Sequence, residues 1–371
     1  MDIFRFMNPG ARTLMEQGAI IEGISSKTWI EKYREPSEFK LEAPISSGLQ
    51  SKLPLGCYIS HIDSTEIMKV ADHEIVQNPG KEPIISITGR GVETITDERI
   101  MGMPNTFPTQ AVPAPLELTD VTVNALLVGY AWSYLVMAGG RSIPYLEISS
   151  EDLPTEVIPE ITVQRVTLHD HLMTVMEVFD LGLKSIRPTG SFINNRFHFH
   201  AGKDRSKEVF FSLDTNDVVS ATYLWSLKQM KNVAYVYGKW VQTQVDQSGS
   251  SHGADKRIMV INASNIDEDF ESAPTGIHRT RAIIAMNSRG RSLLARQNKT
   301  ALSKVELNKD RQSAKYRVDY NVGDLITVVG GFDQTTKKRI TEVAEIEDRN
   351  GLSVFPTLAD LPPVDPGNIG S

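Results

Sequence analysis

The sequence predicts a β-rich α+β protein with an antiparallel sheet or barrel at each end and a helix-containing centre. Short runs of alternating apolar and polar residues, bounded by Gly, Pro, Asn or Ser, fill the first third of the chain and return in its last part. Between them, apolar residues recur at helical spacing. Because 371 residues exceed what one hydrophobic core usually serves, we expect two or more domains.

Five segments of the first third have strand character. Asp63-Ser64 and Asn78-Pro79-Gly80 are typical of turns between consecutive antiparallel strands. Hairpins at this spacing favour an antiparallel sheet or barrel. The expected strands are 19–24, 39–43, 57–62, 66–76 and 83–89, followed by a short helix at 92–100.

Two helices are expected in the centre, after a proline-rich link at 104–115. Thr119 is the expected N-cap of the first, over 120–137, which Gly139-Gly140 ends. The second is expected over 169–181, with Thr167 or Asp170 at its start and Gly182 at its end. One face of this helix should be buried, because its apolar residues recur at helical spacing.

The last part of the chain returns to strands, interrupted by one helix that is basic along part of its surface. The helix is expected at 274–297, and the polar segment 246–255, rich in Ser and Gly, should be an exposed loop. Residues 361–371, which include three Pro and two Gly, are expected to be a tail. The expected strands are 192–200, 208–213, 218–227, 234–243, 304–307, 315–318, 324–329, 338–347 and 352–355.

The composition argues against a protein that grips nucleic acid. Its net charge is -7, whereas such a protein normally shows a basic balance or a clustered basic stripe. The arginine group at 279–296 is interpreted as a solvated or inter-subunit face. Cys57, the one cysteine, cannot form an intramolecular disulfide and should be a small buried side chain. With neither a secretory start nor a membrane-spanning run, we expect a soluble protein made in a cytoplasm.

No catalytic constellation is recognisable, so the sequence predicts no enzyme, no cofactor and no metal site. His198 and His200 share a strand face, but zinc needs further ligands and a supporting shell. His169-Asp170-His171 is better explained as polar capping of a first helical turn. Gly89-Arg90-Gly91 is a strand-to-helix turn without the third glycine of a dinucleotide site. Acidic pairs such as Glu151/Asp152 are interpreted as solvated loops.

Three stretches resemble siphophage baseplate hub proteins, a minor tail protein family common in phages of actinobacteria. Gly202-Lys203-Asp204-Arg205-Ser206, with Val209-Phe210-Phe211-Ser212 and Asn216-Asp217-Val218, resembles the family's G-x-D-R-S/T, V-x-F-S and N-I/V/L block. Ile87 to Gly91 with Arg99-Ile100 resembles its I-x-G-R and R-x-I segment. Tyr320 to Val328 resembles its Y-x-L-G-D-x-V-x-V strand, and Arg339 to Val343 and Pro356 to Leu358 complete the match.

The resemblance covers residues 19–358 and implies two antiparallel, tail-tube-like β-barrels with a helix-containing α/β insertion. Residues 24–33 are more polar than the family's first strand pair, and loop 246–255 has no counterpart. Three copies would form a pseudo-sixfold ring that continues the tail tube, since closed symmetry repeats one surface. The implied domains are 1–112, a first barrel; 113–200 with 243–300, a helix-containing middle region; 201–242 with 301–360, a second barrel; and 361–371, a flexible tail.

What the resemblance implies about function is a structural hub at the distal end of a virion tail. The hub would be a homotrimer that joins the tail tube to fibre or receptor-binding components and lets DNA pass. Its expected partners are the distal tail protein, the tape measure protein and the fibre or receptor-binding proteins, with no specific nucleic-acid binding and no membrane insertion. A channel for DNA should be neutral to acidic, with Glu151, Asp152, Asp267, Glu268 and Asp269 as candidates for its wall.

Six residues are expected to serve structure and assembly: Gly202, Asp204, Arg205, Ser206, Gly323 and Asp324. Asp204 and Ser206 can bond neighbouring backbone amides, and Arg205 suits a forked pair with a carboxylate at a domain or subunit contact. The chief rival function is recognition of a host carbohydrate or receptor, which favours aromatic platforms. Aromatic residues are only 7%, and Trp225 and Trp240 are expected in core strands. A cell-wall hydrolase would require a further catalytic domain.

Overall fold

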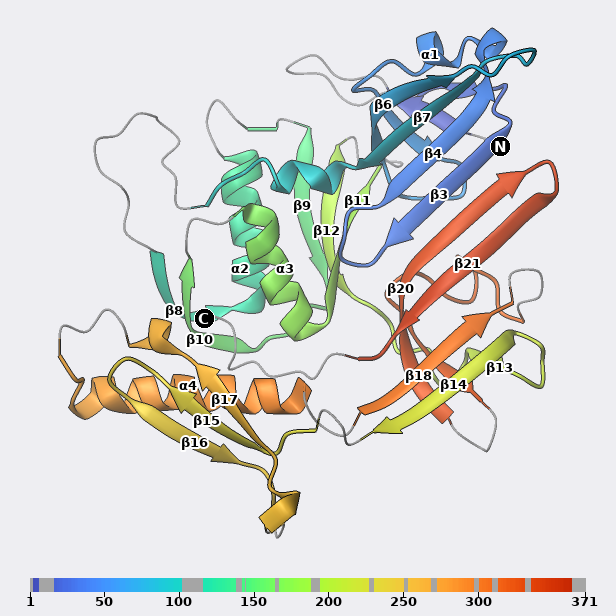
Figure 1. Ribbon diagram of the computed structural model, residues 1–371. Helices are drawn as coiled ribbons and strands as arrows, with labels where there is room; N and C mark the ends of the chain where they lie inside the picture. The colour runs from blue at the N-terminus through green and yellow to red at the C-terminus, as the bar shows by residue number, and fades with distance from the viewer. Residues whose placement is uncertain are drawn as a thin grey trace.

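The computed structural model describes residues 3–6, 17–101, 116–137, 142–143, 145–163, 167–187, 194–226, 230–249, 253–267, 272–296, 300–308, 313–330 and 335–361. It confirms a β-rich α+β fold, with strands at both ends and helices in the centre (Figure 1). The expected tail lies outside the described residues. Within those residues, no helix combines the length and apolarity needed to cross a membrane.

Strands from both ends of the chain join in one large sheet. Its order is β13-β19-β20-β3-β4-β7-β6-β5-β1-β2, with β21 paired to β20. The first block supplies β1 (Ile3–Phe6), β2 (Gln17–Ile21), β3 (Ser26–Lys32), β4 (Glu38–Pro44), β5 (Tyr58–His61), β6 (Met68–Val76) and β7 (Ile84–Gly91). The second block supplies β13 (Phe210–Ser212), β19 (Leu325–Val329), β20 (Thr335–Asp348) and β21 (Gly351–Ala359).

The two blocks meet where β3 pairs with β20. The pairing is antiparallel, with Glu345 opposite Trp29 and Val343 opposite Glu31. Side chains alternate along β3, so Lys27, Trp29 and Glu31 all point into the buried side. No sheet closes on itself in the part of the chain that the structure describes, and the two blocks share one open sheet where two barrels were expected.

Each block nevertheless packs its own hydrophobic core. The first core gathers Trp29, Phe39, Leu41 and Ile87 with their neighbours, and the second gathers Phe211, Tyr320, Ile326 and Ile340. Short helices border the first block: η1 (Ile45–Ser47), α1 (Leu49–Lys52) and the 3-10 helix η2 (Val92–Thr96). Separate cores on one continuous sheet give two β-rich units that backbone hydrogen bonds hold side by side.

The middle of the chain forms a third unit around two helices. Helices α2 (Val123–Ala131), extended by a π-helical turn (Trp132–Val136), and α3 (Leu168–Phe179) lie against the sheet β11-β12-β9 (Figure 1). This sheet contains β9 (Leu146–Glu151), β11 (Leu181–Ile186) and β12 (Asn195–Ala201), and β8 (Leu116–Thr122) pairs with β10 (Val157–Val163). The expected buried face of α3 is confirmed, since Leu172, Val175, Met176 and Phe179 are buried.

Two helix boundaries in this unit differ from those expected. Thr119 lies within β8, and Thr122 caps α2 instead by accepting the amide of Ala125 at 3.2 Å. Strand pairing of 116–122 with β10 extends the strand past the predicted cap. Thr167 caps α3 as predicted, but the helix ends at Asp180 in the left-handed conformation, and Gly182 lies in strand β11.

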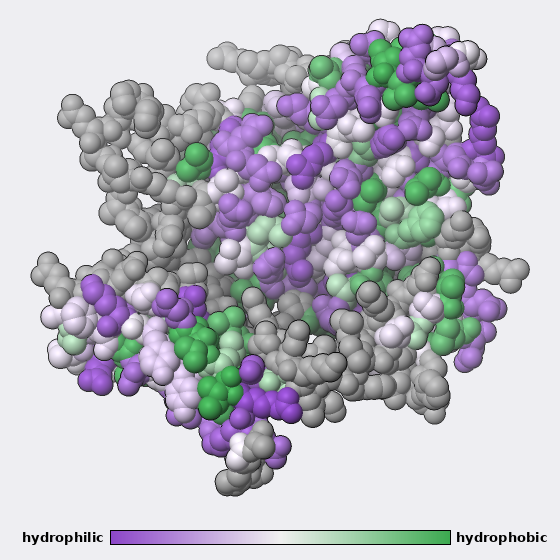
Figure 2. Space-filling model, in the orientation of Figure 1, coloured by the Kyte–Doolittle hydropathy of each residue, from purple (hydrophilic) through white to green (hydrophobic). Residues whose placement is uncertain are grey.

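A fourth unit is inserted between β14 (Val218–Ser226) and β18 (Thr300–Leu307), which pair with each other. It contains β15 (Val233–Tyr237), β16 (Gln242–Asp246), β17 (Ile258–Asn262), the 3-10 turns Gly253–Asp255 and Ser264–Ile266, and α4 (Gly276–Arg296). Helix α4 covers one sheet face and shares a core with it. The other face leaves Tyr237, Ile258 and Val260 exposed, and hydrophobic atoms gather over this unit in Figure 2.

Two other expected strands in the second half of the chain differ from the structure. The segment 234–243 is a hairpin, β15 and β16, because residues 238–241 turn. Trp240, expected in a core strand, lies in that turn and is 42% exposed. The segment 315–318 is a turn in which Arg317 adopts a left-handed φ of 64°. Strands β1, β3, β8, β9, β10, β11 and β17 were not predicted. Strand β3 lies within the polar stretch 24–33 that departs from the family pattern.

Candidate functional site

The turn Gly202–Ser206 lies against the turn Gly323–Asp324, so the structure brings the six predicted residues together. The buried carboxylate of Asp324 accepts the amide of Lys203 at 3.0 Å, the amide of Asn321 at 2.9 Å and Nε–H of Arg205 at 3.1 Å. Leu325 N–H donates to Lys203 O, and Arg205 N–H donates to Leu325 O, each at 2.9 Å. Asp324 therefore ties together two segments that are far apart in the sequence.

Glycine is required where these turns touch. A Cβ at Gly202 would overlap the carbonyl oxygen of Gly323, and Gly323 itself has a φ of 92°. A left-handed φ in this range is strained for residues with a side chain. Both glycines thus allow close approach: Gly202 to the Gly323 backbone, and Gly323 to the Tyr33 ring.

Asp204, Ser206 and Arg205 complete this contact. Ser206 N–H donates to Asp204 Oδ1 at 3.0 Å, and hydrogen bonds from Ser206 and from Lys337 lower the pKa of Asp204 to about 2. Arg205 does not form the expected forked pair. Its Nε bonds Asp324, while Nη1 lies 3.4 Å from Glu208, so two carboxylates share the guanidinium.

Tyr33, just after β3, is the point where the three larger units meet. Its hydroxyl donates to Asp180 O at 2.7 Å and accepts the amide of Gly202 at 3.0 Å. A Cβ at Gly182 or at Gly323 would overlap its ring, so both backbones pack directly on it. Burial raises the pKa of Tyr33, so the phenol stays protonated and keeps donating.

Asp180 pairs with both guanidiniums beside Tyr33. Arg34 and Arg339 each form an ion pair with its carboxylate, and their guanidinium carbons lie 5.1 and 5.4 Å from the centre of the Tyr33 ring. Arg339 also donates to Gly323 O. A residue from each larger unit thus contributes to one buried ion cluster, which we call the Tyr33 junction: Tyr33, Arg34, Asp180, Gly182, Gly202, Gly323 and Arg339.

A second buried cluster lies along the β3–β20 pairing. Glu31 accepts Trp29 Nε1–H at 3.1 Å, Ser64 Oγ–H at 2.5 Å, Arg317 Nη2–H at 2.7 Å and Tyr316 O–H at 2.6 Å. Arg317 also pairs with Glu345 at 2.7 Å. Burial alone would raise the pKa of Glu31, but the charge of Arg317 and these hydrogen bonds hold it below its usual value.

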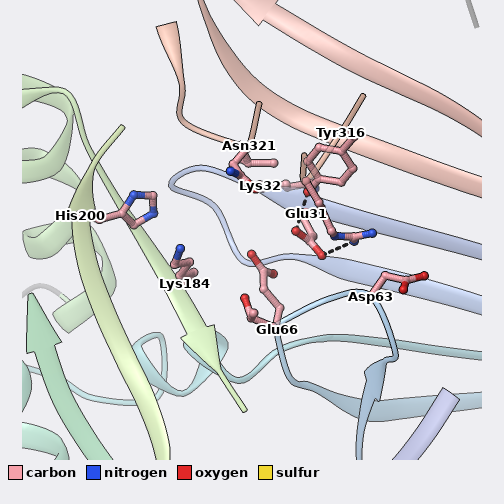
Figure 3. Close-up of a pocket in the computed structure, with 11 residues that line it drawn as sticks. Glu31, Lys32, Asp63, Glu66, Lys184, His200, Tyr316 and Asn321 are labelled. Carbon is pink, nitrogen blue, oxygen red and sulfur yellow. Dashed lines mark hydrogen bonds and ion pairs between the residues drawn. The ribbon is translucent and has the colours of Figure 1, made fainter. Parts of the chain in front are cut away.

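A cavity of about 210 Å³ opens beside this cluster (Figure 3). Glu31, Asp63 and Glu66 enter it from the first block, Lys184 and His200 from the middle unit, and Tyr316 and Asn321 from the second block. The cavity therefore lies where the three larger units converge. Its charged walls face one another across the seams between them.

Three chemistry-bearing residues that the sequence singled out, His198, His200 and Cys57, are partly or fully buried. His198 and His200 stack with ring centroids 5.8 Å apart, and burial lowers the pKa of His200 to about 3. Burial raises the pKa of Cys57 to about 11, which keeps its thiol protonated. Among the described residues, no three His, Cys, Asp or Glu side chains group as metal ligands do.

One candidate for an acidic channel wall is wrong. Asp267 is fully buried, and its carboxylate accepts the amides of Lys239, Trp240 and Val241 at 2.6 to 2.8 Å. It holds the β15–β16 turn and cannot line a lumen. Glu268 and Asp269 lie outside the described residues, whereas Glu151 and Asp152 are exposed.

Sequence reasoning missed the residues that make both clusters. Charged residues at inward positions of β3 were the available signal for Glu31, because alternation in a strand assigns each residue a face. Arg339 lies inside a segment quoted for the family resemblance, but nothing marked it as buried. No local signal indicates Tyr33 or Asp180, whose roles depend on partners more than a hundred residues away.

A family model described as "Siphovirus ReqiPepy6 Gp37-like protein" matches residues 12–358. Among solved structures, a 43 kDa tail protein of prophage MuSo2 from Shewanella oneidensis superposes with a TM-score of 0.57 at 15% identity, over 100% of this chain and 99% of that chain. A tail protein from Neisseria meningitidis gives 0.53 at 7% identity, over 96% of each chain.

The prophage tail protein gp18 from Listeria monocytogenes gives a TM-score of 0.51 at 9% identity, over 98% of this chain and 96% of that chain. At such identities these structures show a shared fold. A search of curated protein sequences finds no match to this chain.

Proposed function

This chain belongs to the Siphovirus ReqiPepy6 Gp37-like family, and from that premise we propose that it is the structural hub of a siphophage tail tip. Its family and the tail proteins that share its fold support a structural role in a phage tail. The position at the distal end, the trimeric state and the passage of DNA are our proposals. The resemblance to baseplate hub proteins motivates them.

The observation that carries the proposal is the single sheet through which the two β-rich blocks are joined. The β3–β20 pairing and the Tyr33 junction fix one block beside the other, so each chain presents two such blocks in a constant relation. Three chains would then present six blocks around an axis, as a threefold part must do to meet a sixfold tube. Symmetric rings repeat one pair of complementary surfaces in this way.

Closure of the blocks into tail-tube-like barrels is part of this proposal. The large sheet ends at β2 and β13, whose outer edges pair with no strand among the described residues. Open strand edges favour pairing with another chain. We expect the edges to become paired between subunits of the ring, which would show as loss of amide exchange in 17–21 or 210–212 on assembly.

Sedimentation of the purified chain at micromolar concentration tests the oligomeric state. A homotrimer of 41.2 kDa chains has a mass of about 124 kDa, three times the chain mass. A cryo-electron microscopy map of the virion tip should show this protein as a threefold ring. A stable twofold or sixfold ring in both measurements would contradict the proposal.

Helix α4 is proposed to contact an acidic surface of a neighbouring chain. Its 21 residues contain five arginines and no Asp or Glu, and Arg279, Arg291 and Ile284 are exposed on it. Charge reversal of Arg279 and Arg291 to Glu should weaken assembly, whereas reversal of Lys40 on the outside of β4 should not. Tight binding of DNA at low salt, lost in the same double variant, would assign α4 to the DNA channel instead.

Recognition of a host receptor or carbohydrate remains a second candidate because of Trp240. Its indole is 42% exposed on a turn that Asp267 holds through three amide hydrogen bonds, and rigid exposed aromatic residues are typical of binding hot spots. Under this alternative, Trp240→Ala should reduce adsorption of otherwise normal virions to host cells. Unchanged adsorption would contradict a role of Trp240 in receptor recognition and would leave the tail-tip hub as the proposed function.

A further inference from the structure

The middle unit is attached to the first block along the edge of β11 that faces away from β12. Leu183 N–H donates to Tyr33 O at 3.0 Å, Ile67 N–H donates to Ser185 O at 3.1 Å, and Arg187 N–H donates to Thr65 O at 2.8 Å. These hydrogen bonds cover one edge of the three-stranded sheet. We call this contact the β11 seam.

Glu93 closes the seam from η2 with its carboxyl group, which forms no ion pair with any described residue. One oxygen accepts the backbone amide of Ser185 on β11, and the other, Oε2, has no hydrogen-bond partner among the described residues. A Cβ at Gly91 would overlap Oε2, so the backbone encloses the group tightly. The side chain is buried and is coupled directly to the strand that the seam holds.

Glu66 lies in the middle of the same seam, where its residue bridges to Ile186. It is 4% exposed, and its Oε2, like that of Glu93, has no hydrogen-bond partner in the part of the chain that the structure describes. The side chain enters the cavity opposite Lys184 and near Glu31 (Figure 3). Glu31 already accepts four hydrogen bonds and stays ionised, so it repels a second negative charge nearby.

We propose that the β11 seam is a proton-controlled joint, closed while the carboxyl groups of Glu66 and Glu93 hold their protons and loosened when they release them. Both groups sit at the contact itself, so their ionisation acts where the first block and the middle unit separate. The neutral forms are compatible with burial, whereas burial disfavours a carboxylate at Glu66, which lies near Glu31, and a carboxylate at Glu93, whose Oε2 is buried without a hydrogen bond.

The surrounding charges determine the direction of the effect. From the first block, Glu31, Lys32 and Asp63 face the cavity; Lys184 and His200 face it from β11 and β12, and Arg317 from the second block. Burial and the charges of Glu31 and Glu93 raise the pKa of Glu66 well above 4.5, with Lys184 opposing them. Burial raises the pKa of Glu93 to about 7, and burial keeps His200 neutral in this range.

A carboxyl group whose pKa is higher in the closed state than in the open state stabilises the closed state. For Glu93 this stabilisation is complete below the ordinary pKa of about 4.5, decreases as pH rises toward the raised pKa of about 7, and is lost above about pH 7. For Glu93 alone, this shift predicts an opening constant that increases about tenfold between about pH 6 and about pH 8.5. Glu66 adds to the increase in the same direction.

Hydrogen exchange of the full chain tests this proposal. After correction for intrinsic rates, exchange in segments 64–68 and 183–187 should accelerate about tenfold or more between about pH 6 and about pH 8.5. Segment 233–237, in the inserted unit, is the internal control and should not change. In the double variant Glu66→Gln/Glu93→Gln, whose side chains are neutral at every pH, the seam segments should lose this pH dependence.

A pH-independent seam in the wild type would overturn the proposal, as would an unchanged pH dependence in the double variant. Infrared difference spectra of the wild type provide a measurement that requires no variant. The absorption of protonated carboxyl groups should disappear over the same pH range in which seam protection is lost. Its absence throughout that range, or its persistence above it, would also overturn the proposal.

Discussion

Replacement of Asp324 by Ala should destabilise the second block more than replacement of Arg205 or Asp204 by Ala. The carboxylate is buried and accepts three donors: two backbone amides, of Lys203 and Asn321, and the guanidinium of Arg205. Alanine leaves both amides without an acceptor in the interior. The change also leaves Arg205 with only the more exposed Glu208 as a carboxylate partner.

The structure sets the magnitude of this loss. A buried donor that loses its acceptor lowers the free energy of unfolding by about 1–3 kcal/mol. Hydrogen bonds to a charged group are among those that stabilise a protein most. Two buried amides without an acceptor therefore cost about 2–6 kcal/mol. Arg205→Ala removes a side chain that is 27% exposed and leaves Asp324 with both amides, so its expected cost is about 1–2 kcal/mol.

Urea unfolding followed by circular dichroism, with hydrogen exchange of 203–206 and 325–329, measures both variants. Asp204→Ala is the matched control, because its exposed carboxylate lies in the same turn and its loss should cost less than about 1 kcal/mol. The expected order of destabilisation is Asp324→Ala, then Arg205→Ala, then Asp204→Ala. An Arg205→Ala variant that loses as much stability as Asp324→Ala would refute this reasoning.

Three further changes probe the two buried clusters by thermal unfolding. Gly202→Ala should cost on the order of 3 kcal/mol because its Cβ overlaps Gly323 O, whereas Gly129→Ala, with open space around it in α2, should be neutral or stabilising. Tyr33→Phe removes hydrogen bonds to Asp180 O and from the Gly202 amide and should cost about 1–3 kcal/mol; an unchanged Tm would contradict that role. Arg317→Met should cost about 3–5 kcal/mol near neutral pH. That loss should shrink as pH falls, because without Arg317 burial raises the pKa of Glu31, and the carboxyl group of the variant is protonated before that of the wild type; a pH-independent loss would speak against ion pairing.

Much of the local structure could be predicted because it depends on neighbours in the chain. Alternation located β4, β5, β6 and β7, and helical spacing located α3 and α4. Where tertiary pairing outweighed local preference, prediction failed. Thr119 became part of β8 because β10 pairs with it, and Gly182 became part of β11 because the Tyr33 ring requires a residue without a side chain there.

The candidate site was predicted in part. The motif Gly202–Ser206 and the pair Gly323–Asp324 were expected to be structural, but nothing in the sequence said that they touch. The expected forked pair of Arg205 also differed, because the amide of Lys203 bonds Oδ1 of Asp324. Nε of Arg205 shares Oδ2 with the amide of Asn321, and Nη1 lies near Glu208 instead. Domain boundaries for the two barrels stay a prediction.

The sequence by itself determined the β-rich α+β class and the helix-containing centre, because side-chain periodicity reports which face of each element is buried. Only the tertiary structure decided that both β-rich ends share one sheet and that Tyr33, Asp180 and Arg339 meet. Edge-to-edge strand pairing uses backbone groups that are common to nearly all residues, so the side chains of β3 do not indicate which strand pairs with it. Buried ion pairs between distant segments likewise require positions that only the folded chain defines.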